Sequence, residues 1–187
     1  MVTTEGCVVG RSKLYVDGKL LVDDDGLHGP AEKCAATTLS EGNHLVYVEG
    51  FQAGGGVQMS IKYSGPDTNG NKVLMKSGQS SKGKSGGRYF ESCDPSAGFS
   101  ASAFTVCVFK SSKGLSTTPS VAGAGQGDSP LKYVGKGTAS VVDMNSADDF
   151  RKAVSGTPNE NFVWAIYGEL VVSSGGSYNL CISSDDG

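Results

Sequence analysis

The sequence lacks the features that mark several large classes of protein. Charged residues make up only 19% of its 187 residues, and the formal net charge is −3. Proteins that bind nucleic acid usually present a basic face, and the one basic cluster here (Lys82, Lys84 and Arg88) is diluted by glycine and serine. No apolar run approaches the roughly 18 residues of a membrane-spanning helix. We therefore expect neither a nucleic-acid partner nor a membrane span.

Sequence motifs for catalysis are missing as well. The chain contains no Gly-x-Ser-x-Gly, no His-Glu-x-x-His and no phosphate-binding loop. Glu49 and Glu169 are single carboxylates on predicted strands, whereas glycoside hydrolysis uses a pair. The two histidines, His28 and His44, have no nucleophile motif beside them, and we expect His28 to pack within its loop. The sequence predicts a protein that is not an enzyme.

The five cysteines are far apart and include no Cys-x-x-Cys pair. Their spacing argues against a zinc site or a thioredoxin-type centre. In a β-protein rich in glycine, serine and threonine, distant cysteines favour disulfides and an oxidising compartment. We therefore expect an extracellular or cell-surface location, with one cysteine left over.

Glycine is abundant, at 28 residues, and strand-like segments alternate with glycine-rich turns. Residues 13–17 and 20–22 predict a hairpin around a Gly18-Lys19 turn. Further predicted strands cover residues 44–51, 57–63, 104–109, 162–172 (as two strands broken near Gly168) and 177–182. In the segment 57–63, the residues Val57, Met59, Ile61 and Tyr63 share one face.

One helix is predicted, over residues 145–154. It begins with a capping residue, carries acidic residues in its first turn, and is stopped by Ser155-Gly156-Thr157-Pro158. Many short strands with one helix predict an all-β protein, an antiparallel β-sandwich of jelly-roll-like form. The soft stretch 111–130 is predicted to be irregular.

Several segments resemble the protective-antigen-type β-sandwich domain family. The resemblance lies in residues 12–18, 21–23, 26–29, 39–44, 48–51, 54–56, 63–68, 162, 168–172, 176–178 and 183–187. Together these segments span most of the chain outside residues 1–11 and 77–98. The combination is specific, although no single piece is.

The order of these segments differs from the family pattern. In the family, Ser-Asp-Asp-Gly runs directly into the segment that here is Ser12 to Gly18, whereas in this chain Ser183 to Gly187 comes last. The resemblance therefore implies a sandwich that is circularly permuted or shared between chains. The implied parts are a seam strand or arm (1–11), the C-terminal half of the sandwich (12–76), a Gly/Ser/Lys-rich linker (77–98) and the N-terminal half (99–187).

The resemblance also implies a ligand site. In sugar-binding members of the family, two adjacent aspartates joined by a cis peptide hold Ca²⁺, which orients sugar hydroxyls, and here these are Asp185 and Asp186. Calcium takes six to eight oxygen ligands, which suits a carboxylate pair. The implied binding rim is the loop of Gln52, Gly54, Gly55 and Gly56, which offers no Asn or Asp as a further ligand. Non-lectin members carry the same aspartates as a structural loop.

Two other groups have competing interpretations. The run Asp23-Asp24-Asp25-Gly26 is interpreted as an exposed acidic turn rather than a second oxygen cluster. Trp164 and Tyr167 either stack on sugars or pack in the core, and we favour the core.

Related extracellular sequences imply a disulfide between Cys34 and Cys181, which would tie the two halves together. Cys93 and Cys107 bracket the start of a strand and are expected to form a local bridge, leaving Cys7 over.

Two functions follow as expectations. The first is a non-enzymatic extracellular structural subunit that self-assembles, as a fibre, through complementation of half-domains by other copies. The alternative is a calcium-dependent carbohydrate-binding module, a permuted monomer whose partners are glycans. The distance between Ser12 and the chain's last residues separates the two arrangements.

Overall fold

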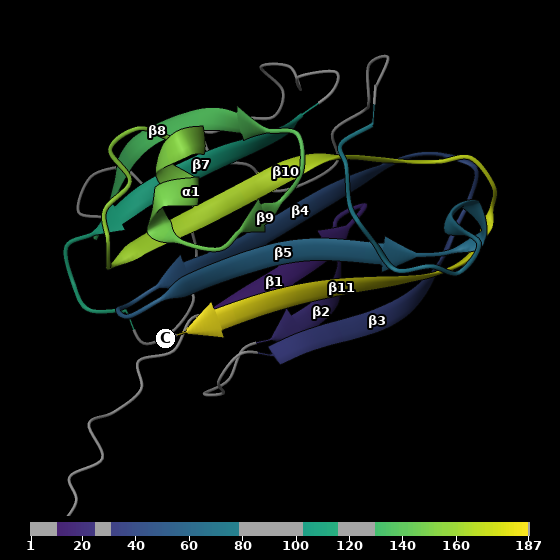
Figure 1. Cartoon of the computed structure of the whole chain (residues 1–187), viewed down its shortest axis with the longest axis horizontal. Helices are drawn as coiled ribbons and strands as arrows, with labels where there is room; N and C mark the ends of the chain where they lie inside the picture. The colour runs from purple at the N-terminus through teal and green to yellow at the C-terminus, as the bar shows by residue number, and fades with distance from the viewer. Residues whose placement is uncertain (1–10, 25–30, 79–102, 116–129, 187) are drawn as a thin grey trace, which may run out of the picture.

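The computed structural model describes residues 11–24, 31–78, 103–115 and 130–186, and these form two packed β-sheets (Figure 1). The strands are β1 (Arg11–Val16), β2 (Lys19–Asp24), β3 (Ala31–Leu39), β4 (Gly42–Gln52), β5 (Val57–Ser64), β6 (Val73–Leu74), β7 (Phe104–Ser111), β8 (Leu131–Ala139), β9 (Asp143–Met144), β10 (Phe162–Val172) and β11 (Gly176–Asp186). The helices are a 3₁₀ turn, η1 (Pro66–Thr68), and α1 (Ala147–Ala153).

The larger sheet has the strand order β2-β1-β4-β10-β7-β8, and the smaller sheet has the order β3-β11-β5-β6, with β9 also paired to β5. Every strand pair in both sheets is antiparallel. The prediction of an antiparallel β-sandwich with one short helix is confirmed.

The predicted hairpin is present, but its turn lies one residue earlier than expected. Asp17 and Gly18 both have positive φ, +49° and +79°, and Val16 pairs with Lys19. Two successive positive φ values define the turn whose twist matches that of the flanking strands. Asp17 also accepts a hydrogen bond from the Leu45 backbone N–H through Oδ1, at 2.9 Å, which fixes the turn against β4.

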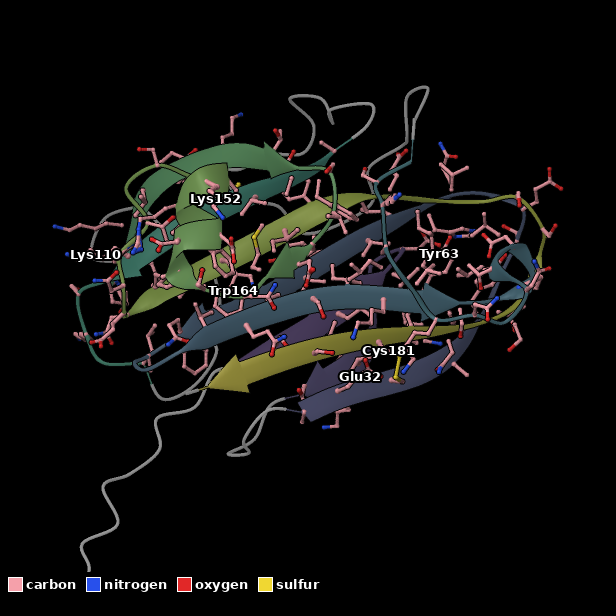
Figure 2. The ribbon with its side chains drawn as sticks, in the orientation of Figure 1. Glu32, Tyr63, Lys110, Lys152, Trp164 and Cys181 are labelled. Carbon is pink, nitrogen blue, oxygen red and sulfur yellow. A yellow bond between two sulfur atoms is a disulfide. The ribbon has the colours of Figure 1, made fainter. Side chains whose placement is uncertain are left out.

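Helix α1 is present, with its cap one residue later than the predicted start at Asn145. The Ser146 side chain caps it by accepting the Asp149 N–H at 3.3 Å. Its Phe150 is fully buried, with ring centroids 5.4 Å from Phe162 and 5.1 Å from Trp164. Trp164 is only 1% exposed and lies beneath the helix (Figure 2), so the interpretation of this tryptophan as a core residue is confirmed.

The prediction of two short strands broken near Gly168 is wrong, because β10 runs unbroken from Phe162 to Val172 and pairs with β4 along its whole length. Gly168 serves close packing instead. A Cβ atom at this position would lie 2.5 Å from Cδ1 of Phe104, on the neighbouring strand. Strands β3 and β8 were not predicted at all, although β11, predicted over 177–182, is present and longer.

The sandwich interior is lined by alternate residues of the two sheets. Val46, Val48, Met59 and Ile61 are among its fully buried members. A second apolar cluster contains Phe51, Phe109, Val163, Ala165 and Tyr167. In β10 its members alternate with the interior residues Trp164 and Ile166, so it lies on the outer face of the larger sheet, and β10 is buried on both sides.

Strands from both predicted halves lie in both sheets, and they complete one sandwich within one chain. The seam is closed by side chains near the chain ends. Ser12 Oγ donates to Ser184 Oγ at 3.3 Å, and Ser184 Oγ donates to Asp24 Oδ2 at 3.1 Å. Most of the predicted linker, residues 79–98, lies outside the described residues, as do the seam residues 1–10 and Gly187.

The predicted disulfide between Cys34 and Cys181 is confirmed. The two residues stand directly opposite each other on β3 and β11, so the bond joins strands from the two halves, which are 147 residues apart in sequence. Cys107 is also disulfide-bonded. Its predicted partner Cys93, and Cys7, lie outside the described residues, so that pairing stays a prediction.

Replacing both Cys34 and Cys181 by alanine is expected to lower the free energy of unfolding by about 2–4 kcal/mol, because the unfolded chain regains the freedom of a long loop. Urea unfolding under oxidising conditions measures the loss. Under reducing conditions the two proteins should unfold at the same urea concentration. Equal midpoints under oxidising conditions would contradict the expectation.

Candidate functional site

The structure brings together the two segments of the predicted ligand site. Asp185 pairs with Gln58 and Asp186 pairs with Val57 in the β11–β5 ladder. Val57 follows directly on Gly54–Gly56, which we call the glycine loop, where β4 turns into β5. Figure 1 shows the arrowhead of β11 at this end of the sandwich. The backbone of the aspartate pair therefore lies at the base of the glycine loop.

One part of the expectation for Asp185 and Asp186 is wrong. The resemblance implies a loop with a cis peptide, but both residues continue β11 in regular pairing with β5, and the described residues contain only trans peptide bonds. The reason is physical, since β5 extends to Val57 and offers β11 ladder hydrogen bonds as far as Asp186. The side chains of the two aspartates lie outside what the structure describes.

The Gln52 side chain holds the glycine loop through hydrogen bonds. Its side chain is fully buried, and its Nε2 donates to the backbone carbonyls of Gly54 at 2.8 Å, Gly55 at 3.1 Å and Gly56 at 2.7 Å. The three carbonyl oxygens therefore lie around one nitrogen atom, Nε2 of Gln52. Its own Oε1 is buried and has no hydrogen-bond partner among the described residues. Such a buried acceptor without a partner is costly unless a ligand satisfies it.

Glu160 also lies at this end of the sandwich, and no sequence pattern predicted it there. It precedes β10, and its carboxyl carbon lies 3.9 Å from the point that a Cβ atom on Gly54 would occupy. Glu160 is an exposed residue. No local signal points to it, because Glu160 and Gly54 are more than a hundred positions apart and only the pairing of β10 with β4 brings them together.

Several residues at this end of the sandwich are of types that carry oxygen ligands. Asp185, Asp186, Glu160 and the Oε1 of Gln52 all offer oxygen, which is the ligand that Ca²⁺ takes in proteins. The carbonyls of the glycine loop each accept a hydrogen bond from Gln52, and each keeps a second lone pair.

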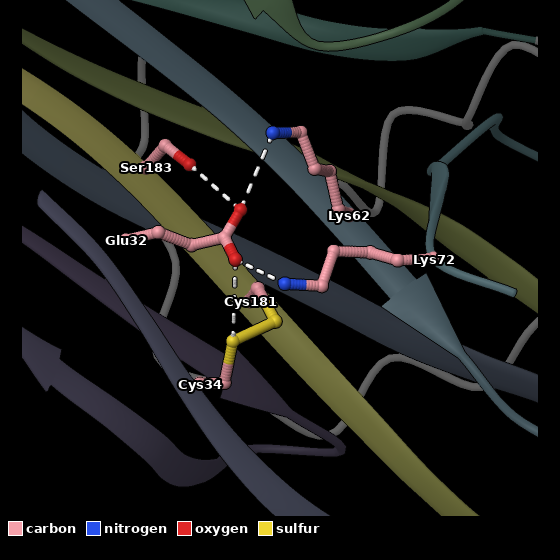
Figure 3. Close-up of a disulfide and its surroundings, with 6 residues drawn as sticks. All are labelled: Glu32, Cys34, Lys62, Lys72, Cys181 and Ser183. Atoms are coloured by element: carbon pink, nitrogen blue, oxygen red, sulfur yellow. Dashed lines mark hydrogen bonds and ion pairs between the residues drawn. A yellow bond between two sulfur atoms is a disulfide. The ribbon is translucent and has the colours of Figure 1, made fainter. Parts of the chain in front are cut away.

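A carboxylate also stands beside the disulfide on the outer face of the smaller sheet (Figure 3). Glu32 accepts from Lys62 at 3.2 Å, from Ser183 at 3.3 Å and from Lys72. The hydrogen bond from Lys72, followed by that from Lys62, outweighs partial burial and lowers the pKa of Glu32. Because Cys34 and Cys181 are oxidised and the carboxylate is neutralised by two lysines, this group is a surface ion-pair cluster rather than a metal site.

The acidic run at the end of β2 differs from expectation. The interpretation as an exposed turn is wrong for Asp24, which is 2% exposed. β2 continues through Asp24, which pairs with Ser12 and lies 3.5 Å from Lys33 Nζ. Asp25 and Gly26 lie outside the described residues, as does His28.

A shallow pocket lies at the far end of β5 from the glycine loop. Ser64, Gly65, Asn69, Ser177 and Asn179 are among its lining residues. None of the predicted site residues lines it. Its aromatic wall, Tyr178, is 1% exposed and donates its hydroxyl to the Ser174 carbonyl at 2.7 Å, so this ring has no face free for stacking.

No protein-family model, curated protein or solved structure matches this chain. The resemblance to the protective-antigen-type domain accordingly stays a prediction. Within the described residues, no helix has both the length and the apolar character that crossing a membrane requires.

His44 forms a clamp between two turns. Its Nδ1 lies 2.7 Å from Asp17 Oδ2 and its Nε2 lies 3.0 Å from the Ser40 carbonyl. Burial alone would lower the pKa of His44, but the hydrogen bonds to Asp17 and Ser40 together with the charge of Asp17 outweigh it, and the pKa is raised above 6.5. Both ring nitrogens face acceptors, which is the environment that imidazolium needs.

The clamp predicts a specific dependence of stability on pH. Because the folded-state pKa of His44 is raised, its contribution is complete below the unfolded value of about 6.5 and is lost as the pH rises through the folded value. Urea unfolding between pH 5.5 and 9 should show wild-type stability falling across this window. The His44→Gln variant should lack this component, and parallel curves for the two proteins would contradict the assignment.

Proposed function

We propose that this protein is a non-enzymatic extracellular module that binds carbohydrate, with calcium, at the end of the sandwich formed by the glycine loop and residues 185–186. The observation that carries the proposal is the pairing of Asp185 and Asp186 with Gln58 and Val57. Two segments more than a hundred positions apart in the sequence meet there, and the sequence motifs predict that both belong to one site. The completion of the sandwich within one chain supports the permuted single-chain arrangement.

Different residues at this end of the sandwich have different roles in binding the sugar. Calcium, when bound, supplies a positive charge on which vicinal hydroxyls of a sugar are oriented. Gln52 holds the glycine loop in one conformation, so little conformational entropy is lost when a ligand binds. The three glycines leave the backbone open to close approach, and Glu160 offers a further acceptor for a hydroxyl.

Two further observations support the extracellular, non-catalytic part of the proposal. The Cys34–Cys181 disulfide is the kind of bond that persists in an oxidising compartment. Glu169, one of the strand carboxylates, is 4% exposed and accepts a hydrogen bond from Asn43 at 3.3 Å. Glu49 accepts hydrogen bonds from two tyrosines. Both carboxylates thus have structural partners.

A glycan array probed in calcium and in chelator tests the proposal. We expect binding to a subset of glycans that chelator abolishes and that the Asp185→Asn/Asp186→Asn variant loses, because amides are weaker calcium ligands than carboxylates. Calorimetric titration with Ca²⁺ measures the metal separately.

The matched control is Asp148→Asn on α1, where the carboxylate is exposed and pairs with Arg151 at 3.1 Å. It should bind like the wild type. Silence on the array with and without chelator would refute carbohydrate binding.

The second candidate is a self-assembling structural subunit, and the free edge of β3 favours it. β3 pairs with β11 over nine residues without a register shift, and within the described residues no strand pairs with its other side. A long regular edge can accept a strand from another copy, and a pairing that does not close on itself produces a fibre. Complete sandwiches would then join edge to edge.

One feature of β3 makes self-assembly the weaker of the two candidate functions. Lys33 turns from this edge strand toward the larger sheet, donating to the Asp23 carbonyl at 2.7 Å and approaching the buried Asp24. The Lys33 side chain is 54% exposed, and a charged lysine on an edge strand is a common protection of sheets against pairing.

Sedimentation and negative-stain electron microscopy over a concentration series test assembly. If β3 is the joining edge, wild-type protein forms concentration-dependent oligomers or fibres, and Ala36→Lys on exposed β3 reduces them. Ser155→Lys, at an exposed position beyond α1, should have no effect. A monomer at all concentrations would exclude this candidate.

A further inference from the structure

Two tyrosines share one carboxylate on the outer face of the larger sheet. Tyr15 of β1 donates its hydroxyl to Glu49 Oε1 at 3.2 Å, and Tyr47 of β4 donates to Glu49 Oε2 at 2.9 Å. Their ring centroids are 5.6 Å apart, with the planes inclined by 47°. All three residues are partly exposed. None of them belongs to the glycine-loop site.

The arrangement follows from strand register. Tyr15 and Tyr47 are directly opposite in the β1–β4 ladder, and Glu49 lies two positions along β4 on the same face. Because both hydroxyls end on one carboxylate, the rings converge at their hydroxyl ends. The ring carbons next to the hydroxyls are the carbons through which oxidised tyrosines couple.

We propose that Tyr15 and Tyr47 are a site of oxidative cross-linking, at which a peroxidase-type one-electron oxidant supplied with hydrogen peroxide joins the two rings as dityrosine within one chain. The inference does not depend on carbohydrate binding or on assembly. It assigns this face a covalent modification that would join two neighbouring strands of the larger sheet.

The chemistry balances with peroxide as the terminal oxidant. Each phenol loses one electron and its hydroxyl proton and becomes a tyrosyl radical. The two radicals form a carbon–carbon bond between positions adjacent to the oxygens, and each of these carbons then passes its hydrogen to its own oxygen, which restores both phenols. The protein loses two hydrogen atoms in all, and one hydrogen peroxide is reduced to two molecules of water.

Glu49 is placed to accept the protons. Burial, together with the charge of Glu49 and its hydrogen bond, raises the pKa of Tyr15 to about 12 and also raises that of Tyr47. Both phenols therefore hold their protons at neutral pH, and removing an electron requires a nearby base. Glu49 is a positioning residue that holds both rings and takes the protons as the electrons leave.

The same chain contains a second tyrosine pair, on the smaller sheet. Tyr63 and Tyr178 have centroids 6.4 Å apart in a stacked arrangement inclined by 25°. The Tyr178 hydroxyl donates to the Ser174 carbonyl at 2.7 Å. Burial, followed by the charge of Asp67, raises the pKa of both Tyr63 and Tyr178, so a carboxylate lies near this pair too. The pair differs from Tyr15 and Tyr47 in its stacked rings and in the burial of Tyr178, and it therefore serves as a comparison for ring geometry and access.

The experiment treats the full chain, at a concentration where it is monomeric, with peroxidase and hydrogen peroxide. Dityrosine fluorescence gives the initial rate, and intact mass gives the loss of two hydrogen atoms. After reduction and trypsin digestion, a cross-linked peptide should join residues 14–19 to residues 34–62. We expect Tyr15→Phe and Tyr47→Phe each to abolish this peptide, and Tyr63→Phe to leave it unchanged.

Glu49→Gln keeps the shape of the side chain and removes the base, so the initial rate should fall several-fold while circular dichroism stays unchanged. A cross-link mapped to Tyr63–Tyr178, or only between chains, would overturn the proposal. So would fluorescence that survives Tyr15→Phe. An unchanged rate in Glu49→Gln would remove the assigned role of Glu49.

Discussion

The position of β11 between β3 and β5 is the constraint on which the rest of the structure depends. This strand is paired on both sides, carries the buried Leu180 and Ile182 into the interior, and is bonded to β3 through Cys181. Its last residues then reach Ser12 and the base of the glycine loop. If β11 were absent, β3 would lose its only described strand partner and the candidate ligand site would lose its aspartates.

The larger sheet is organised around a different condition, since its central strands are buried on both faces. In β10, Trp164 and Ile166 face the sandwich interior, whereas Val163 and Ala165 belong to the cluster on the outer face. Toward β1 this outer face becomes polar and aromatic, with Tyr15, Tyr47 and Glu49 in hydrogen-bonded contact. One sheet thus offers an apolar centre and a partly exposed rim of different chemistry.

Sequence patterns predicted the strands and the helix that depend on neighbouring residues alone, through alternating burial, capping or turn residues. The alternation of β5, with Val57, Met59 and Ile61 buried, follows from a strand with one face against a core. The cap of α1 at Ser146 and the β1–β2 hairpin are likewise local. The pattern failed for β3, whose residues at the sheet edge are mostly exposed and therefore show no alternation. It also failed for β8, where Gly137 interrupts the pattern because the end of α1 packs against it.

The amino-acid sequence by itself determined the class of fold, the short helix and, through resemblance, the disulfide and the two segments of the candidate site. These depend on periodicity, capping and recurring motifs, which are defined by residues close together in the sequence. Only the tertiary structure decided that the two halves complete each other in one chain, that Glu160 stands beside Gly54, and that Tyr15 and Tyr47 share Glu49. The physical reason is that pairing between distant strands brings these groups together, and the register that aligns them is set by how whole faces pack.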